Sequence, residues 1–526
     1  MKDIFKSLRQ DLPSGLVTFL VALPLCLGVG LASTNVESIN GLPNVFSGII
    51  AGIIGGVVVG FFSGSRIGVS GPAAGLITIL IAALTTLGSF EGLLVAIILA
   101  GIIQIIAGFA GLGILANYFP SAVIKGMLAA IGLTLILKEI PHALGYDKDF
   151  FGDDAFFQID GHNTFSELLY AFNALQPGSI IISIVSIGIL LLFERPYFKK
   201  IALFKILPGA LFAVVIAVLL NTFFQFFIPS IGVNGKHLVE LPVINSLNDV
   251  TSVLSFPDFS FLNNPNVYIV ALTLAFVGSL ETLLSVEATD KLDPEKHHTP
   301  TNRELKAQGI GNILSGLIGG LPVTQVIIRS SANVNAGAKT KASTIIHGLL
   351  LLIAVAFLPK IINLIPLACL AAILILVGYK LSKVQIYKQL YINGFDQFIP
   401  FIATILGILF TDLLKGIGIG IAVSIFYILR KNFRNNYMLT EEEKDNQMHI
   451  KIVLSEVVTF LNKSSMIETL SAIPNDSFVI IDGRQCESID FDVMEIIQEF
   501  KLVGAATRNI VLTTVNIPEI KTVSGH

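Results

Sequence analysis

Long apolar stretches follow one another along most of the chain, with only short polar breaks between them. A helix needs about 20 mostly apolar residues to cross a bilayer, so this pattern predicts an all-α polytopic membrane domain. Segment 328–336 is too short to span alone, and segment 72–88 follows a polar Ser63–Arg66 stretch that we also expect inside the membrane. The fourteen predicted segments are 14–33, 44–62, 72–88, 91–112, 118–138, 178–194, 203–228, 267–289, 305–320, 328–336, 342–360, 365–380, 396–413 and 414–431.

The pattern changes near the C-terminus, where strands are predicted to alternate with helices. We expect strands at Met448–Val453, Ser477–Ile481 and Asn509–Thr514, and a helix at Phe491–Val503. Such alternation is typical of a small α/β domain, and the polar Glu441–Lys444 run before it suggests a linker. The predicted organisation is therefore a membrane domain at 1–435, a linker at 436–447 and a cytoplasmic domain at 448–526.

Composition supports this organisation and excludes several classes of protein. Hydrophobic residues make up 53% of the 526 residues and charged residues only 13%, against about 25% charged in an average soluble domain. The chain has no basic block, which argues against nucleic-acid binding. Three widely separated cysteines draw neither a disulfide framework nor a metal site, and we expect no cofactor. The first apolar run lacks a clear cleavage site, so we expect a retained span.

Charge between the segments predicts the orientation of the chain. Lysine and arginine gather in the connections 195–205, 290–306 and 380–388, whereas the connection 139–177 carries five aspartates against Lys148. Basic connections remain on the cytoplasmic side, so both termini are predicted to be cytoplasmic, in a bacterial inner membrane. Lys125 and His347 are expected near the membrane boundaries.

Two Gly- and Pro-rich interruptions occupy matching places in the two halves of the membrane domain. Ser63–Gly75 leads into one predicted half-helix and Gly319–Ser331 into another. Paired interruptions of this kind point to a transporter's binding site near the bilayer midplane. Two facing helix N-termini present free N–H groups and positive dipole ends, which favour an anion. The alternative is that Pro72 and Pro322 merely kink two packed helices.

Two ionisable residues fall inside predicted spans. Arg329 is the first charged residue of the second half-helix, and an intramembrane arginine is a functional candidate by default. Glu281 lies in the middle of the helical Ala271–Asp290, with Ser285 one turn later on the same face. The carboxyl group of Glu281 should be neutralised by a proton, by Arg329 or by a cation. A permanent structural pair between Arg329 and Glu281 is the alternative to a coupling role.

The residues Asn302–Pro322, Ser70–Pro72 and the Arg329 to Gly337-Ala-Lys-Thr340 spacing resemble the SulP family of sulfate permeases and anion exchangers. The resemblance implies fourteen segments in two inverted repeats of seven, as in uracil permease, with a core domain that moves past a gate domain. It implies a cytoplasmic STAS domain, related to anti-sigma-factor antagonists, and a homodimer. The implied anion-binding residues, at the third and tenth segments, are Ser70, Gly71, Pro72, Ala73, Ala74, Ile327, Ile328, Arg329 and Ser330.

The same resemblance bears on substrate and coupling. Ser279–Ser285 is similar to the segment that holds sodium in the family's bicarbonate transporters, where an Asp replaces Glu281, a Thr replaces Ser285, and small or hydroxyl residues replace Ile327 and Arg329. We therefore expect a proton-coupled or exchanging transporter of sulfate or bicarbonate that works by elevator-type alternating access, with Glu281 and Ser285 in coupling. A sodium-driven bicarbonate symporter and a dicarboxylate transporter are the alternatives.

The STAS resemblance also places Asp492 where regulated members carry a phosphorylated serine. We expect no such switch here and a role for the domain in dimer contact or partner binding.

Three other classes of protein are alternatives to a transporter of this kind. A nucleobase carrier should place carboxylates in the spans that supply both half-helix sites, but this chain has Arg329 in the second. An intramembrane enzyme should show clustered catalytic groups, which the sequence lacks. A receptor on the same fold stays open at this point, since only a flux assay separates it from a transporter.

Overall fold

The computed structural model describes residues 2–32, 45–148, 156, 163–195, 208–240, 254–434, 437–444 and 447–518. Contacts divide the chain into two units, Met1–Ile421 and Ala422–His526, and each is described by itself. Most of the basic connection 195–205, and the four aspartates of the acidic connection other than Asp147, lie outside the described residues.

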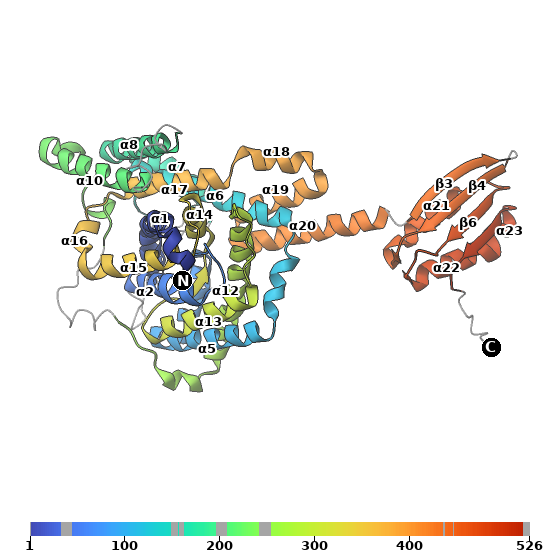
Figure 1. Ribbon diagram of the computed structural model, residues 1–526, viewed down its shortest axis with the longest axis horizontal. Coiled ribbons are helices and arrows are strands. Elements are labelled where there is room, and N and C mark those ends of the chain that lie inside the picture. Colours follow the sequence, from blue (N-terminus) through green and yellow to red (C-terminus); the bar gives the residue numbers. More distant parts are fainter. Residues whose placement is uncertain are drawn as a thin grey trace. The chain divides into compact units, whose positions relative to one another are not determined.

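The larger unit is helical, and each of the fourteen predicted segments overlaps a helix (Figure 1). Eight of the described helices are long and apolar enough to cross a membrane, and three further apolar helices are shorter. The chain is therefore a multi-pass membrane protein. Its helices are α1 Lys2–Ala32, α2 Val45–Ile54, α3 Gly60–Phe62, α4 Ile77–Leu87, α5 Phe90–Phe109, α6 Ser121–Leu144, α7 Thr164–Asn173, α8 Pro177–Glu194, α10 Gly209–Phe227, α12 Pro265–Leu292, α13 Thr301–Leu317, α14 Ile327–Asn335, α15 Ala342–Phe357, α16 Pro359–Ile362, α17 Leu367–Leu381, α18 Val384–Ile392, α19 Phe395–Phe410 and the first part of α20 Leu413–Arg434, which continues into the second unit.

Two hydrophobic cores hold these helices together. One joins α1 to α6, α8, α10, α15, α17 and α19, and the other joins α2 to α4, α5 and α12. Glycines allow the closest crossings: a Cβ on Gly309 of α13 would lie 2.5 Å from the Gly101 carbonyl oxygen of α5, and Gly132 of α6 meets Gly378 of α17 in the same way. Small residues are what allow membrane helices to pack at such short range.

Two short strands lie inside the larger unit. Strands β1 (Ser70–Pro72) and β2 (Val323–Gln325) pair antiparallel, with Ser70 opposite Gln325 and Pro72 opposite Val323. All six residues are buried, as irregular backbone at membrane depth must be. Strand β1 leads through a 3-10 turn, Ala74–Leu76, into α4, and β2 leads into α14. The structure therefore brings the two predicted interruptions side by side.

The second unit contains a four-stranded sheet in the order β3-β4-β6-β8, in which β3 is antiparallel to β4 and the other neighbours are parallel. Alternate residues of β4 and β6, such as Ile452 and Ile481, pack in a core with Met466 of α21 and Val493 of α22. The elements are β3 Tyr437–Lys444, β4 Gln447–Leu454, β5 Val457–Val458, α21 Lys463–Ala472, β6 Phe478–Asp482, β7 Ser488–Ile489, α22 Phe491–Glu499, α23 Ala505–Thr507 and β8 Val511–Val515.

One boundary prediction is wrong in this unit. Residues 437–444, which we expected in a linker, form β3 and pair along their whole length with β4. Strand β3 is an edge strand and almost entirely exposed, so its charged residues remain in water while its backbone completes the sheet. Charge on an edge strand also discourages pairing with another chain.

Candidate functional site

The N-terminus of α14 is the first part of the site. Val326 precedes the helix in an extended conformation, and no side chain caps the first turn among the described residues. Instead, the Ser330 hydroxyl accepts from the Val69 N–H (2.9 Å) and donates to the Val326 carbonyl (2.7 Å). Within the part of the chain that the structure describes, the helix end therefore keeps N–H groups that no side chain caps, and a positive dipole end, both of which suit an anion.

The guanidinium of Arg329 reaches from α14 to β1. The side chain is 2% exposed, and Nη2 donates to the Pro72 carbonyl at 3.3 Å. A Cβ at position 71 would collide with Nη1, so only Gly71 leaves room for the guanidinium. The Cys26 thiol lies beside it. Within the described residues, Nη1 makes no hydrogen bond and no carboxylate lies at ion-pair distance from Arg329.

Glu281 contacts the other half of the site. Its side chain is 7% exposed, and a Cβ on Gly75, in the turn before α4, would lie 3.1 Å from Oε1. One residue later, the Thr282 hydroxyl accepts from the Gln325 N–H of β2 at 3.3 Å. Helix α12 thus touches both interruptions, with Ser285 buried one turn further along. The alternative of a permanent structural pair between Arg329 and Glu281 finds no support among the described residues, because Arg329 reaches β1 at Gly71 and Pro72 whereas Glu281 lies against Gly75, in the turn before α4.

The predicted binding residues gather where the two strands meet their half-helices. Ser70, Gly71, Pro72, Ala73, Ile327, Arg329 and Ser330 are buried, Ile328 is half-buried, and Ala74 begins the 3-10 turn. The hydroxyls of Ser70 and Ser330 already bond to protein groups. Around the strand pair, the buried donors that lack a partner among the described residues are the Arg329 Nη1 and the Thr324 hydroxyl of β2.

A polar face of α13 supports both strands, and sequence reasoning missed its role. Gln308 donates to the Ser70 hydroxyl (2.7 Å) and to Glu304 (3.0 Å). Asn312 exchanges two hydrogen bonds with the backbone of Val323, at 2.6 and 3.1 Å. These three polar residues recur every four positions, so they share one helix face. That spacing was visible in the sequence and is the signal that could have revealed it.

His347, predicted near a membrane boundary, is buried within the protein. Its side chain is 0% exposed in α15, and the positive charge of Arg329 acts on it. Hydropathy alone did not indicate that it would lie on the side of α15 that faces the anion-site residues.

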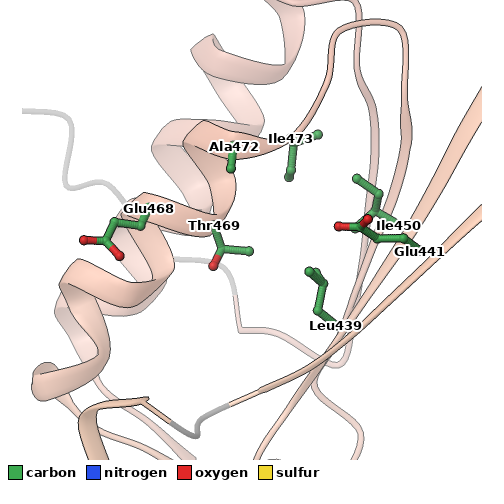
Figure 2. Close-up of a pocket in the computed structure, with 7 residues that line it drawn as sticks. All are labelled: Leu439, Glu441, Ile450, Glu468, Thr469, Ala472 and Ile473. Carbon is green, nitrogen blue, oxygen red and sulfur yellow. The ribbon is translucent and has the colours of Figure 1, made fainter. Parts of the chain in front are cut away.

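A separate cavity lies in the second unit, between α21 and strands β3 and β4 (Figure 2). Its volume is about 270 Å³, and the lining is mostly apolar, with Glu441 and Glu468 as its charged residues. Two carboxylates repel an anion, so the lining of this cavity does not favour anion binding. In the same unit, Asp492 lies half-exposed, 3.3 Å from the Lys463 Nζ.

Comparison with known proteins gives relatives with named substrates. "Putative sulfate transporter YvdB" of Bacillus subtilis (strain 168) is 28% identical over 428 residues, covering 80% of this chain and 74% of the relative. "Bicarbonate transporter BicA" of Picosynechococcus sp. is 26% identical over 456 residues, covering 85% and 75%. The "Sodium-independent sulfate anion transporter" of Bos taurus is 23% identical over an alignment that covers 95% of this chain and 83% of the relative.

Solved structures share the fold. The transmembrane domain of a cyanobacterial BicA matches with a TM-score of 0.51 at 23% identity, over 81% of this chain and 96% of that one. Murine Slc26a9 in the inward-facing state matches with a TM-score of 0.65 at 16% identity, over 97% and 85%. The model of the sulfate permease family matches residues 8–403, which is most of the chain. This chain therefore belongs to the sulfate permease family.

Proposed function

We propose that the protein is a secondary active transporter of a small inorganic anion, sulfate or bicarbonate. The observation that carries the proposal is the buried Arg329 guanidinium, which has no carboxylate at ion-pair distance among the described residues and lies at an uncapped helix N-terminus. A buried charge without a counter-charge is costly in a low-dielectric interior. An entering anion would supply that counter-charge. The names of the relatives indicate the same class of substrate.

The proposed mechanism is elevator-type alternating access on fourteen segments in two inverted repeats. The anion binds at Ser70–Ala74 and Ile327–Ser330, and the core domain carries it past the gate domain. Glu281, which lies against the turn that begins the first half-helix, gains or loses a proton as the core moves, with Ser285 beside it. We propose that both termini are cytoplasmic, that the protein is a homodimer, and that the C-terminal unit, which fits a STAS domain, contributes to dimer or partner contact.

The test of substrate is uptake of labelled sulfate and bicarbonate into proteoliposomes that hold the full-length protein. Arg329→Gln should abolish uptake because it removes the cation while leaving donors on a side chain of similar reach. Arg430→Gln, on an exposed position of α20, is the matched control and should transport normally. Full activity of Arg329→Gln would refute the proposed site.

The test of coupling imposes a proton or a sodium gradient on the same vesicles. Uptake driven by protons and made insensitive to the gradient by Glu281→Gln would support the coupling role. Bicarbonate uptake driven only by sodium would reassign the protein to sodium symport, with Glu281 and Ser285 as cation ligands.

A further inference from the structure

His347 is a buried polar side chain without a hydrogen bond. Its ring is fully buried in α15, and neither Nδ1 nor Nε2 has a partner within the described residues. A buried donor and acceptor left unpaired destabilise the fold, and an apolar residue would fill the same space without that penalty. The stability of α15 therefore does not explain a histidine at this position.

The neighbours of His347 place it beside the anion site. One turn earlier on α15, Ser343 accepts from Asn333 of α14 at 2.9 Å and Thr344 donates to the Gly68 carbonyl at 3.1 Å. One turn later, Leu351 packs on Gly52 of α2 next to Cys26. Residues three and four apart lie on one helix face. His347 thus faces the junction of α1, α2, α14 and the approach to β1, which is where the Arg329 guanidinium lies.

Few charged or titratable groups lie at this junction. Helix α14 contributes the charged Arg329 and α1 contributes the titratable Cys26 thiol, whereas α2 and β1 contribute glycines such as Gly52 and Gly71. A second positive charge next to Arg329 is strongly disfavoured in a dry interior, because the two charges repel at low effective dielectric. Burial and repulsion by Arg329 therefore both disfavour a charged His347 while the site is empty. A bound dianion reverses this situation, since Arg329 neutralises only one of its two charges.

We propose that His347 takes up a proton when a divalent anion binds at Arg329, so that a dianion enters together with one proton and a monovalent anion enters without it. The inference rests on the proposed function and specifies how the same site selects anion charge. Binding and protonation then promote each other by equal factors. The affinity for a dianion should rise as the pH falls, by up to about tenfold per pH unit for one coupled proton.

The test compares two anions whose own charges are fixed near neutral pH. Sulfate and nitrate affinities are measured on the purified full-length protein as a function of pH, from ligand-induced thermal stabilisation. The wild-type protein should show a steeper pH dependence for sulfate than for nitrate. Any proton taken up at Glu281 would affect both anions, so the difference between the two slopes reports His347.

Variants identify the group. His347→Gln keeps a polar side chain that cannot become charged, and it should bring the sulfate slope down to the nitrate slope. His298→Gln, on an exposed histidine, is the matched control and should retain the difference. The proposal is overturned if His347→Gln retains the difference between the sulfate and nitrate slopes, including the case in which Glu281→Gln loses that difference. If His347→Gln fails to fold, the wild-type comparison still decides, because equal pH slopes for sulfate and nitrate are enough to overturn the proposal. Saturable binding of neither anion, together with no uptake of labelled sulfate or bicarbonate, would instead refute the proposed function.

Discussion

The packing of Gly71 against Arg329 gives a quantitative prediction. Gly71→Ala places a methyl group in collision with Nη1, at 3.3 Å from Cζ and 3.6 Å from the Gly52 Cα. The backbone of Gly52 is far enough away to accommodate it, so the guanidinium is the group that must move. Because Nη1 ends a long side chain, we expect an overpacking cost of about 1–3 kcal/mol rather than unfolding. The displaced Arg329 loses its bond to the Pro72 carbonyl and its place at the end of α14.

The assay measures thermal stability in detergent and sulfate uptake in proteoliposomes. Gly71→Ala should fold, lose a few degrees of thermal stability and lose most uptake. Gly188→Ala is the matched control, because nothing lies within 4 Å of a Cβ there and alanine favours a helix by up to about 1 kcal/mol over glycine. Arg329→Lys lacks the Nη1 atom, so Gly71→Ala and Arg329→Lys should be less than additive in stability. Wild-type stability and uptake in Gly71→Ala would refute the placement of the guanidinium.

Three further perturbations test how the strands and helices are held. Asn312→Ala leaves the Val323 N–H without its partner and should cost about 1–3 kcal/mol, seen as a lower melting temperature with reduced uptake; unchanged values would mean that β2 is held otherwise. Gly309→Leu forces a side chain against the Gly101 carbonyl of α5, so we expect little folded protein by size-exclusion chromatography, and a monodisperse peak would contradict the crossing. Burial raises the pKa of Asp147, but hydrogen bonds from two histidines outweigh it and lower that pKa overall. A carboxyl group with a depressed pKa stabilises the fold at pH values above its ordinary pKa, and this stabilisation is lost as the pH falls toward and through the depressed pKa. Asp147→Asn should therefore lower the melting temperature at neutral pH and have a smaller effect in acid.

The apolar pattern was enough to predict the helices because a bilayer requires helices of a minimum length. The Gly- and Pro-rich breaks revealed the two interruptions for a similar reason, since unpaired backbone is not tolerated in a bilayer except where protein covers it. Their pairing as strands β1 and β2 came only from the structure. The prediction failed at 437–444, because three consecutive glutamates resemble a linker and an edge strand alike. Only the pairing with β4 distinguishes a strand from a linker at these residues.

The sequence by itself determined a multi-pass helical protein of the sulfate permease family, with an intramembrane arginine, an intramembrane glutamate and two interrupted segments. The tertiary structure decided which of these groups meet. It directs Arg329 to β1 beside Gly71 and Cys26, leaves Glu281 at Gly75, and buries His347 close to the guanidinium. The physical reason is that hydropathy reports the depth a segment prefers, whereas the direction of a side chain depends on the rotation of its helix against several neighbours. That rotation is set by long-range packing, which local patterns do not contain.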